Sequence, residues 1–280
     1  DASIKKPLTS SLVKVFNTNN SSLLAHHKIG QNQVLPTVFA IAWMKEACES
    51  LYPEYQYQGI ENFKLFKGIV FDGNEAEHFL IETKLMTDND SSLAVEVTVS
   101  SEQPSSDSQQ GKLQFHYRAL VNLTLDNKGQ IAIYENELPL PQAVTAQACE
   151  SVDLLYSDGS LFHGKNFQGI KQLHRVDQSG LLMECVIDES TLAAQGEFLL
   201  AEHNVLANDL VYQALLIWTN KLMGVGSLPT KTNRWQINRE VGINEVFFIK
   251  LIITEMLGQK VVGDVLLIDR ENKIISKVSG

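Results

Sequence analysis

Two long apolar segments, one in each half of the chain, dominate the hydrophobic pattern. Residues 37–51 follow Pro36 and are apolar on nearly every side at their start. Proline suits the first turn of a helix, and a helix that is apolar all round is enclosed on most sides. The pattern therefore predicts a buried helix here. It predicts a second one over residues 209–223, ending before Gly224, a residue type that favours helix C-termini.

Most of the remaining regular structure has the period of a β-strand. Apolar and polar residues alternate in runs that are rich in β-branched and aromatic side chains. Some of these runs follow the first helix, and others lie on both sides of the second. We predict strands over residues 60–71, 78–86, 92–99, 113–125, 169–176, 180–187, 234–243, 246–257, 260–268 and 274–278.

A proline-containing stretch separates the two halves. Residues 138–148 begin LPLPQAVTAQ, and the two prolines favour an extended segment. We predict a linker here, between an N-terminal half over residues 1–137 and a C-terminal half over residues 149–280. Each half then holds one long buried helix and its own antiparallel strands. Two antiparallel sheets, each wrapped around a long buried helix, form an α+β fold called the double hotdog.

Charge and composition narrow the class of protein. The chain of 280 residues has 23 Lys and Arg against 33 Asp and Glu, a net charge of −10, which argues against nucleic-acid binding. Hydrophobic residues make up 44%, enough for a large core. The apolar runs fall short of the roughly 20 residues of a membrane-spanning helix, so we expect no membrane association.

The cysteines and the N-terminus indicate a cytoplasmic segment of a longer polypeptide. Cys48, Cys149 and Cys185 are odd in number and far apart, which favours buried reduced thiols over a disulfide framework or a metal site. The first residues, DASIKKPLTSS, lack both a starting Met and an apolar signal core.

The first stretch with candidate chemistry is LLAHHKIGQNQVLPTVFAIAWM, residues 23–44. It places His27 in a loop with Gly30, just before the helix that Pro36 opens. The unpaired N–H groups at a helix N-terminus can hold a carbonyl oxygen that gains negative charge. The alternative interpretation is an ordinary polar histidine on the surface.

The second stretch is LANDLVYQALLIW, residues 206–218. Asp209 and Gln213 are four residues apart, on one face of an otherwise apolar helix. Asp209 could simply be the N-cap of that helix. Apolar surroundings would also raise the pKa of the Asp209 carboxyl group and suit it to general acid catalysis.

The third stretch is LLYSDGSLFHGKNFQGI, residues 154–170. Its aromatic residues could line an apolar slot with a histidine at the polar end, or they could be ordinary core residues at the entry to a strand. The candidates for substrate binding are Tyr156, Phe162, His163, Gly164 and Phe167.

Together the three stretches resemble the dehydratase domains of polyketide and fatty-acid synthases. The first motif of that family is HxxxGxxxxP, and His27 precedes Pro36 by the required 36 − 27 = 9 positions. The second is an aspartate followed four positions later by Gln or His, which Asp209 and Gln213 match.

The family segment GYxYGPxF is similar to LFHGKNFQG here, with Gly164 and Phe167 in register. The form LFHGxxFQ, together with VLPT, is most similar to the dehydratase-type domains of bacterial polyunsaturated fatty acid synthases.

The resemblance implies a double hotdog that removes water from a 3-hydroxyacyl thioester to give a 2-enoyl thioester. It implies that His27 removes the C2 proton, that Asp209 protonates the leaving C3 hydroxyl and that Gln213 orients the Asp209 carboxyl group. It implies no metal and no nucleotide cofactor. The substrate would arrive on the phosphopantetheine arm of an acyl carrier protein, beside other domains of a multidomain synthase. Lys231 and Arg234 are candidates for a basic patch that docks such a carrier.

The chain departs from the family pattern at four positions. Gln31 stands where the first motif has glycine, and His26 replaces the acidic residue that often precedes the histidine. His163 stands at the second tyrosine of GYxYGPxF, and Lys165 stands at its proline.

Three other functions remain open from the sequence. A catalytically inactive structural or acyl-chain-holding domain would have His27 and Asp209 apart, or a closed tunnel. An enoyl isomerase would use the same acid and base. A cyclising product-template domain shares the fold. A metal site built from His26, His27, Glu202 and His203 is disfavoured, because adjacent residues of an extended segment point apart.

Overall fold

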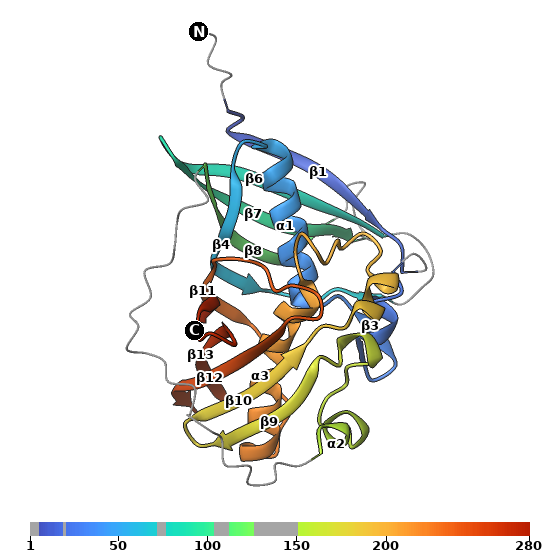
Figure 1. Ribbon diagram of the computed structural model, residues 1–280. Coiled ribbons are helices and arrows are strands. Elements are labelled where there is room, and N and C mark those ends of the chain that lie inside the picture. The colour runs from blue at the N-terminus through green and yellow to red at the C-terminus, as the bar shows by residue number, and fades with distance from the viewer. Residues whose placement is uncertain (1–5, 19–20, 72–76, 104–111, 126–150) are drawn as a thin grey trace.

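A computed structural model describes residues 6–18, 21–71, 77–103, 112–125 and 151–280 of the chain. Its two long helices, α1 (Thr37–Leu51) and α3 (Val205–Met223), each lie against a curved antiparallel sheet (Figure 1). α1 contacts strands of the N-terminal half, and α3 contacts strands of the C-terminal half. This arrangement is the predicted double hotdog.

The first long helix has the predicted bounds. Pro36 is its N-cap residue, and Phe39, Trp43 and Met44 are among its fully buried side chains. The strands that pack against it are β4 (Gln56–Leu65), β6 (Glu77–Asn89), β7 (Ser92–Gln103) and β8 (Lys112–Thr124). Because the helix is apolar around most of its circumference, it needs this enclosure to remain out of water.

The second long helix begins one turn earlier than predicted. The Asn204 side chain accepts a hydrogen bond from the N–H group of Ala207 at 3.0 Å, so Asn204 and not Asp209 is the N-cap. Asp209 therefore lies in the second turn, where its backbone groups are already paired and its carboxylate is free for other contacts. The helix ends as predicted at Gly224, which has a φ of 67°.

The two halves join edge to edge through β4 and β11. The described strands of both halves thus form one 11-stranded sheet, in the order β1-β6-β7-β8-β4-β11-β14-β13-β12-β10-β9. At the seam, Ile60 pairs with Trp235, and both side chains are buried. Gly59 pairs with Gln236 in the same ladder. The strands of the large sheet are β1 (Thr9–Phe16), β4 (Gln56–Leu65), β6 (Glu77–Asn89), β7 (Ser92–Gln103), β8 (Lys112–Thr124), β9 (Ile170–Asp177), β10 (Gly180–Val186), β11 (Lys231–Ile237), β12 (Val246–Leu257), β13 (Lys260–Asp269) and β14 (Ile274–Ser279).

A small second sheet and several short helices complete the described structure. A three-stranded sheet in the order β2-β3-β5 flanks the start of α1. The short elements are β2 (Lys28–Ile29), β3 (Asn32–Val34), β5 (Val70–Phe71), the helix α2 (Val152–Ser157) and the 3₁₀ helices η2 (Leu24–His26), η4 (Lys165–Phe167) and η5 (Glu189–Ala194).

The strand predictions are wrong at three places. The predicted strand over residues 60–71 is two strands, β4 and β5, separated by a loop. The predicted strand over residues 234–243 is β11, which ends at Ile237. Strand β1 was not predicted, because its Val13 and Val15 side chains are exposed, so its pattern is not that of a half-buried strand.

The predicted linker, residues 138–148, lies outside the described residues, and so does Cys149. The bounds of the two halves at the linker therefore stay a prediction. Cys48 and Cys185 are free and buried, as expected. Among the described residues, no helix is long and apolar enough to cross a membrane.

The seam between the halves gives a test of the fold. Gly59 has a φ of 137°, and a Cβ atom there would overlap the carbonyl oxygen of Trp235. We expect Gly59→Ala to lower the free energy of unfolding by about 3 kcal/mol, from the strained φ and the backbone overlap together. Gly258→Ala is the control, since Gly258 has a φ of 59° with open space around it, and it should cost only about 1 kcal/mol. Equal losses in urea titrations of the two variants would contradict this account of the seam.

Candidate active site

The two halves meet again at a short backbone contact that carries two histidines. His27, just after η2, forms an isolated antiparallel bridge with His163 of the C-terminal half. Beside it, the N–H group of Gly164 donates a hydrogen bond to the carbonyl oxygen of His26 at 2.7 Å. A Cβ atom at Gly164 would lie 2.6 Å from Nδ1 of His26, so only glycine permits this approach.

The His27 ring is fixed in one tautomer. Its Nδ1–H group donates to the carbonyl oxygen of Val34 at 2.7 Å, and a carbonyl can only accept. The hydrogen of the neutral ring is therefore on Nδ1, which leaves a lone pair on Nε2. The ring packs edge-on against Phe162, with the ring centroids 5.1 Å apart.

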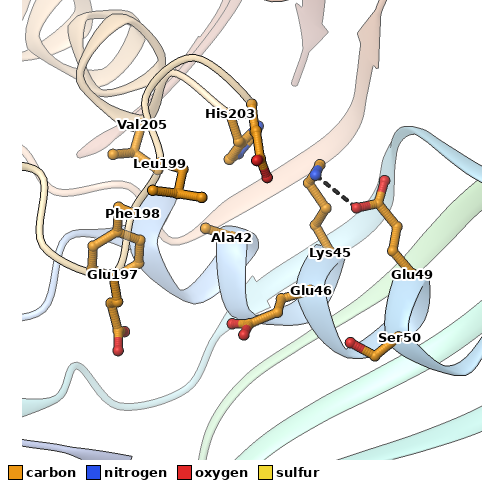
Figure 2. Close-up of a pocket in the computed structure, with 11 residues that line it drawn as sticks. Ala42, Lys45, Glu46, Glu49, Ser50, Glu197, Phe198, Leu199, His203 and Val205 are labelled. Atoms are coloured by element: carbon orange, nitrogen blue, oxygen red, sulfur yellow. Dashed lines mark hydrogen bonds and ion pairs between the residues drawn. The ribbon is translucent and has the colours of Figure 1, made fainter. Parts of the chain in front are cut away.

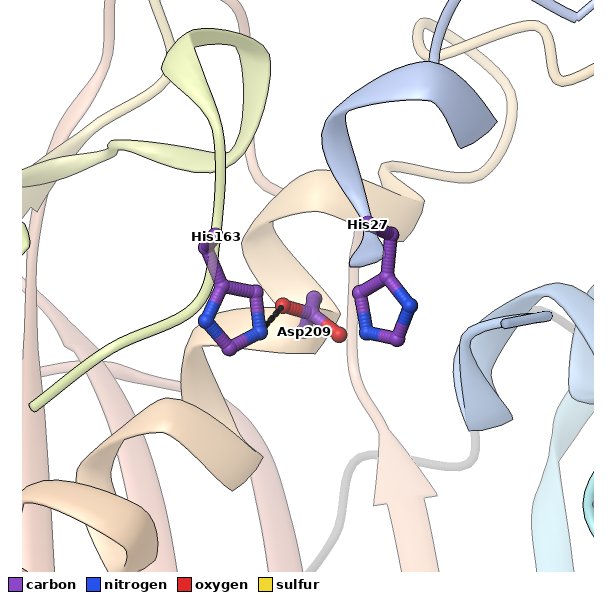
Figure 3. Close-up of side chains that lie close together, drawn as sticks. All are labelled: His27, His163 and Asp209. Carbon is purple, nitrogen blue, oxygen red and sulfur yellow. Dashed lines mark ion pairs between the residues drawn. The ribbon is translucent and has the colours of Figure 1, made fainter. Parts of the chain in front are cut away.

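The second side of the site comes from α3 (Figure 3). Nε2 of His163 lies 3.3 Å from Oδ2 of Asp209. Nε2–H of Gln213 donates to the same oxygen at 2.9 Å and to the carbonyl oxygen of Phe167 at 3.0 Å. The Tyr156 hydroxyl donates to Oε1 of Gln213 at 3.1 Å. Among the described residues, the side chains that contact the carboxylate reach Oδ2, which leaves Oδ1 of Asp209 for a ligand.

Burial and the neighbouring charges set the protonation states. Burial is the largest cause that lowers the pKa of His27 below its ordinary value of about 6.5, and a positive charge on His163 lowers it further, against the opposing effect of Asp209. Burial alone would raise the pKa of Asp209. The hydrogen bond from His163 and the charges of His163 and His27 outweigh burial and hold the pKa of Asp209 below its usual range. The expectation of a raised Asp209 pKa is therefore wrong.

His27, His163 and Asp209 open onto one cavity of about 210 Å³. Its floor and walls come from both halves of the chain, and most of the lining side chains are apolar. The remaining lining residues are Ile29, Val34, Leu35, Thr37, Leu65, Gly68, Tyr117, Phe162, Tyr212, Leu216, Ser227, Leu228, Pro229 and Thr230.

The structure brings most of the predicted site residues together. His27, Asp209, Phe162 and His163 line the cavity. The other candidates except Gly30 surround it: Gln213, Tyr156 and Phe167 hold Asp209 in place, Gly164 holds the histidine contact, and Pro36 caps the helix whose first residue, Thr37, lines the cavity.

Gly30 is the exception among the predicted site residues. It lies in the exposed turn between β2 and β3, has a φ of 63° and is not part of the cavity lining. The structure therefore does not bring Gly30 to the site. Glycine at position 30 is required by the turn, because a positive φ strains residues that have a side chain.

Sequence reasoning missed part of the cavity wall. Tyr117 on β8, Tyr212 and Leu216 on α3, and the segment over residues 227–230 all line the cavity. Tyr212 and Leu216 lie three and seven residues after Asp209, so the helical period places them on the same face of α3 as Asp209. Nothing in the sequence marks the segment over residues 227–230, because its role depends on where the chain passes after α3.

Three donor atoms in the cavity are close enough to share a ligand. One atom each from His27, His163 and Asp209 lie within 4.8 Å of one another, and no other such group of three occurs among the described residues. Two imidazoles and a carboxylate are a donor set that zinc accepts. The alternative metal site of His26, His27, Glu202 and His203 is therefore wrong.

His203 belongs instead to a second cavity, of about 380 Å³, between α1 and the loop before α3 (Figure 2). Nδ1–H of His203 donates to Oε1 of Glu240 at 2.8 Å. Lys45 and Glu49, which also line this cavity, form an ion pair at 2.7 Å. None of the predicted site residues lines this second cavity.

Comparison with known proteins identifies the class of fold. No protein-family model matches the chain. One subunit of the polyunsaturated fatty acid synthase of Thraustochytrium sp. is 30% identical over 247 residues, which are 87% of this chain and 8% of that protein's length. The dehydratase domain of the CurF module of the curacin polyketide synthase has a TM-score of 0.73 at 17% identity, covering 98% of this chain and 92% of that domain.

Two similar structures are variants of the CurK dehydratase of the same synthase, each described as inactive. One replaces an aspartate by Asn and has a TM-score of 0.66 at 17% identity, covering 99% of this chain and 91% of that one. The other replaces a histidine by Phe and has a TM-score of 0.64 at 16% identity, covering 100% and 91%.

The chain therefore has the double-hotdog fold of the dehydratase domains of polyketide synthases. In sequence it is similar to a short part of a much longer protein of polyunsaturated fatty acid synthesis. The fold that the motifs predicted is confirmed.

The electrostatics of the site give a direct test. We expect an NMR titration of the ring signals to give His27 a pKa below its ordinary value of about 6.5, because burial penalises the charged ring. The neutral form should keep its hydrogen on Nδ1, as the bond to Val34 requires. Replacement of His27 by Ala assigns the signal. A pKa above 6.5, or a hydrogen on Nε2 of the neutral ring, would contradict the geometry.

Proposed function

We propose that this chain is a 3-hydroxyacyl dehydratase that removes water from an acyl thioester to give the 2-enoyl thioester. The observation that carries this proposal is the single cavity that joins His27 of the first half to Asp209 of the second, with donor atoms within 4.8 Å. An unprotonated imidazole nitrogen and a carboxyl group on opposite sides of one apolar cavity suit removal of a proton and loss of a hydroxyl.

His27 is the proposed base. Its Nδ1–H bond to Val34 orients the ring and leaves the Nε2 lone pair for the C2 proton of the substrate. The lowered pKa keeps the ring neutral near pH 7, which is the form a base needs. The thioester carbonyl gains negative charge as the C2 proton leaves. Thr37 at the N-terminus of α1 lines the cavity, so the N–H groups of that first turn are the proposed partners of the carbonyl oxygen.

The proposed acid is Asp209 acting together with His163. Because its contacts with His163, His27 and Gln213 outweigh burial and hold the pKa of Asp209 below its usual range, the Asp209 carboxyl group in this site carries no proton of its own at neutral pH. His163 Nε2 lies 3.3 Å from Oδ2 of Asp209, and we propose that the leaving hydroxyl takes its proton from this pair. Gln213 fixes the carboxyl orientation through its bond to Oδ2.

The proton balance of the proposed reaction closes within the cavity. His27 Nε2 takes the C2 proton, the C2–H electrons form the C2=C3 double bond, and the C3–O bond breaks. The leaving oxygen takes the proton of the Asp209–His163 pair and departs as water. His27 then returns its proton to the pair. The His27 and His163 rings are in edge-to-face contact, with their centroids 5.3 Å apart, so the base lies next to the pair that it recharges.

The geometry speaks against a purely structural role, which required His27 and Asp209 to be apart or the cavity to be closed. The descriptions of the two CurK variants add support, since loss of a histidine or of an aspartate accompanies inactivity in a protein of this fold. We further propose that the substrate arrives on the phosphopantetheine arm of an acyl carrier protein, and that the proposed steps use only the side chains named here.

The test is a mass-spectrometric assay of the purified chain with 3-hydroxyacyl thioesters of several lengths. Wild-type protein should release water and form the 2-enoyl thioester. His27→Ala and Asp209→Asn should each lower kcat by at least about 100-fold, because each removes one partner of the proton transfer. His163→Phe should lower kcat by a smaller factor, about tenfold to 100-fold, since Asp209 keeps its bond from Gln213.

His78→Ala is the matched control for loss of a histidine, because His78 is exposed on β6 and lies outside the cavity lining. It should keep wild-type activity. No water loss from any chain length, in a sample with a cooperative unfolding transition, would refute the dehydratase assignment. A 3-enoyl product would assign the site to an isomerase instead.

A further inference from the structure

A row of three positive charges crosses the outer face of the large sheet. In the ladder between β11 and β4, Lys231 pairs with Lys64, and in the ladder between β4 and β8, Lys64 pairs with Arg118. Directly opposite residues have Cβ atoms about 5 Å apart, and like charges at such positions destabilise a sheet. None of the three forms an ion pair with a described residue.

The neighbouring row on the same face is balanced in charge. There Arg234 pairs with Glu61 across the same ladder, and the two side chains form an ion pair at 3.2 Å. Further along that row, Glu96 pairs with Lys84. The unbalanced row is thus a local feature, in a chain whose net charge is −10. Beyond Arg118, the row with three cations continues with Thr98 on β7 and then Glu82 on β6. Glu82 is the first acidic residue in that row.

The basic row lies beside the wall of the proposed catalytic cavity, at the end of β4 and the start of β11. Leu65 and Thr230, which line the cavity, directly follow Lys64 and directly precede Lys231 in the chain. The N–H group of Leu65 donates to the carbonyl oxygen of Thr230 at 2.9 Å, so this rim is one hydrogen-bonded unit.

An exposed aromatic ring accompanies the charges. The Phe66 side chain is 52% exposed, and Cζ of Arg118 lies 5.7 Å from its ring centroid. Gly68, two residues further, also lines the cavity. This rim therefore offers three cations that form no ion pair with a described residue, together with an exposed ring that Arg118 covers. Arg and aromatic residues are enriched at protein interfaces.

We propose that Lys64, Lys231, Arg118 and Phe66 form the docking surface for an acidic protein that delivers the acyl group into the cavity on a flexible arm. This inference rests on the proposed function and identifies the surface of this chain that the partner would bind. Charge complementarity favours an acidic protein. An extended polyanion such as a nucleic acid, or an anionic membrane, would also meet the carboxylates of the neighbouring row, Glu61 and Glu96, and the net negative charge of the chain.

The decisive variant is Lys64→Glu, which places a negative charge between two positive ones. It removes the like-charge contacts, so the melting temperature should stay equal or rise. The KM for a 3-hydroxyacyl group on a carrier protein should rise about tenfold at low salt, because charges at the rim of an interface steer association. The kcat/KM for the same acyl group on free pantetheine should stay within about twofold of wild type.

Lys171→Glu is the matched control, since Lys171 is exposed on β9, at the far end of the strand order from β11. It makes the same charge change and should leave both substrates unaffected. An unchanged KM for the carrier-bound substrate in Lys64→Glu, or an equal loss with both substrates, would overturn the docking assignment.

A binding measurement separates this proposal from the dehydratase proposal. The Kd of fluorescently labelled acyl carrier protein, measured by anisotropy, should rise in Lys64→Glu and not in Lys171→Glu, even if neither thioester loses water. Equal affinity of the wild type and Lys64→Glu for the carrier would refute the surface. Binding of anionic vesicles or of an oligonucleotide as tightly as the carrier, with the same dependence on Lys64, would also refute it.

Discussion

The site depends on one backbone contact between segments that are far apart in the sequence. The Gly164 N–H group donates to the His26 carbonyl oxygen, and this bond holds His27 and His163 in an antiparallel bridge. Without it, His27 of the N-terminal half would lie apart from His163 and Asp209 of the C-terminal half. A Cβ atom at Gly164 would lie 2.6 Å from Nδ1 of His26, so glycine at this position lets the two segments approach each other.

Hydrogen-bonding partners within the site explain how Asp209 can be buried. Asp209 is 3% exposed, and an isolated carboxylate at such a position would be costly. His163 and Gln213 both reach Oδ2, and Tyr156 and the Phe167 carbonyl hold Gln213. His163 stands where the resemblance has a tyrosine. In this chain, therefore, an imidazole ring lies 3.3 Å from the proposed acid.

The sequence predicted much of the fold, because the strongest patterns are also the most physically constrained. The helix over residues 37–51 has the bounds expected from Pro36 and an apolar circumference. The start of α3 was misplaced because Asp209 directly precedes the long apolar run and looks like a cap, while the actual N-cap, Asn204, lies five residues earlier. His27, Asp209 and Gln213 were found from their spacing. The pairing of His163 with Asp209, and the cation row of Lys64, Lys231 and Arg118, depend on tertiary pairing and strand register, which no local pattern records.

The central claim is that one cavity built from both halves adds and removes water across C2 and C3. The most direct measurement is to supply the wild-type protein with a 2-enoyl thioester in ¹⁸O-labelled D₂O and to analyse the thioester by mass spectrometry. We predict 3-hydroxyacyl thioester with ¹⁸O on C3 and deuterium at C2, because the reverse reaction uses the same groups. A folded protein that leaves the enoyl thioester unlabelled at both carbons would contradict the claim.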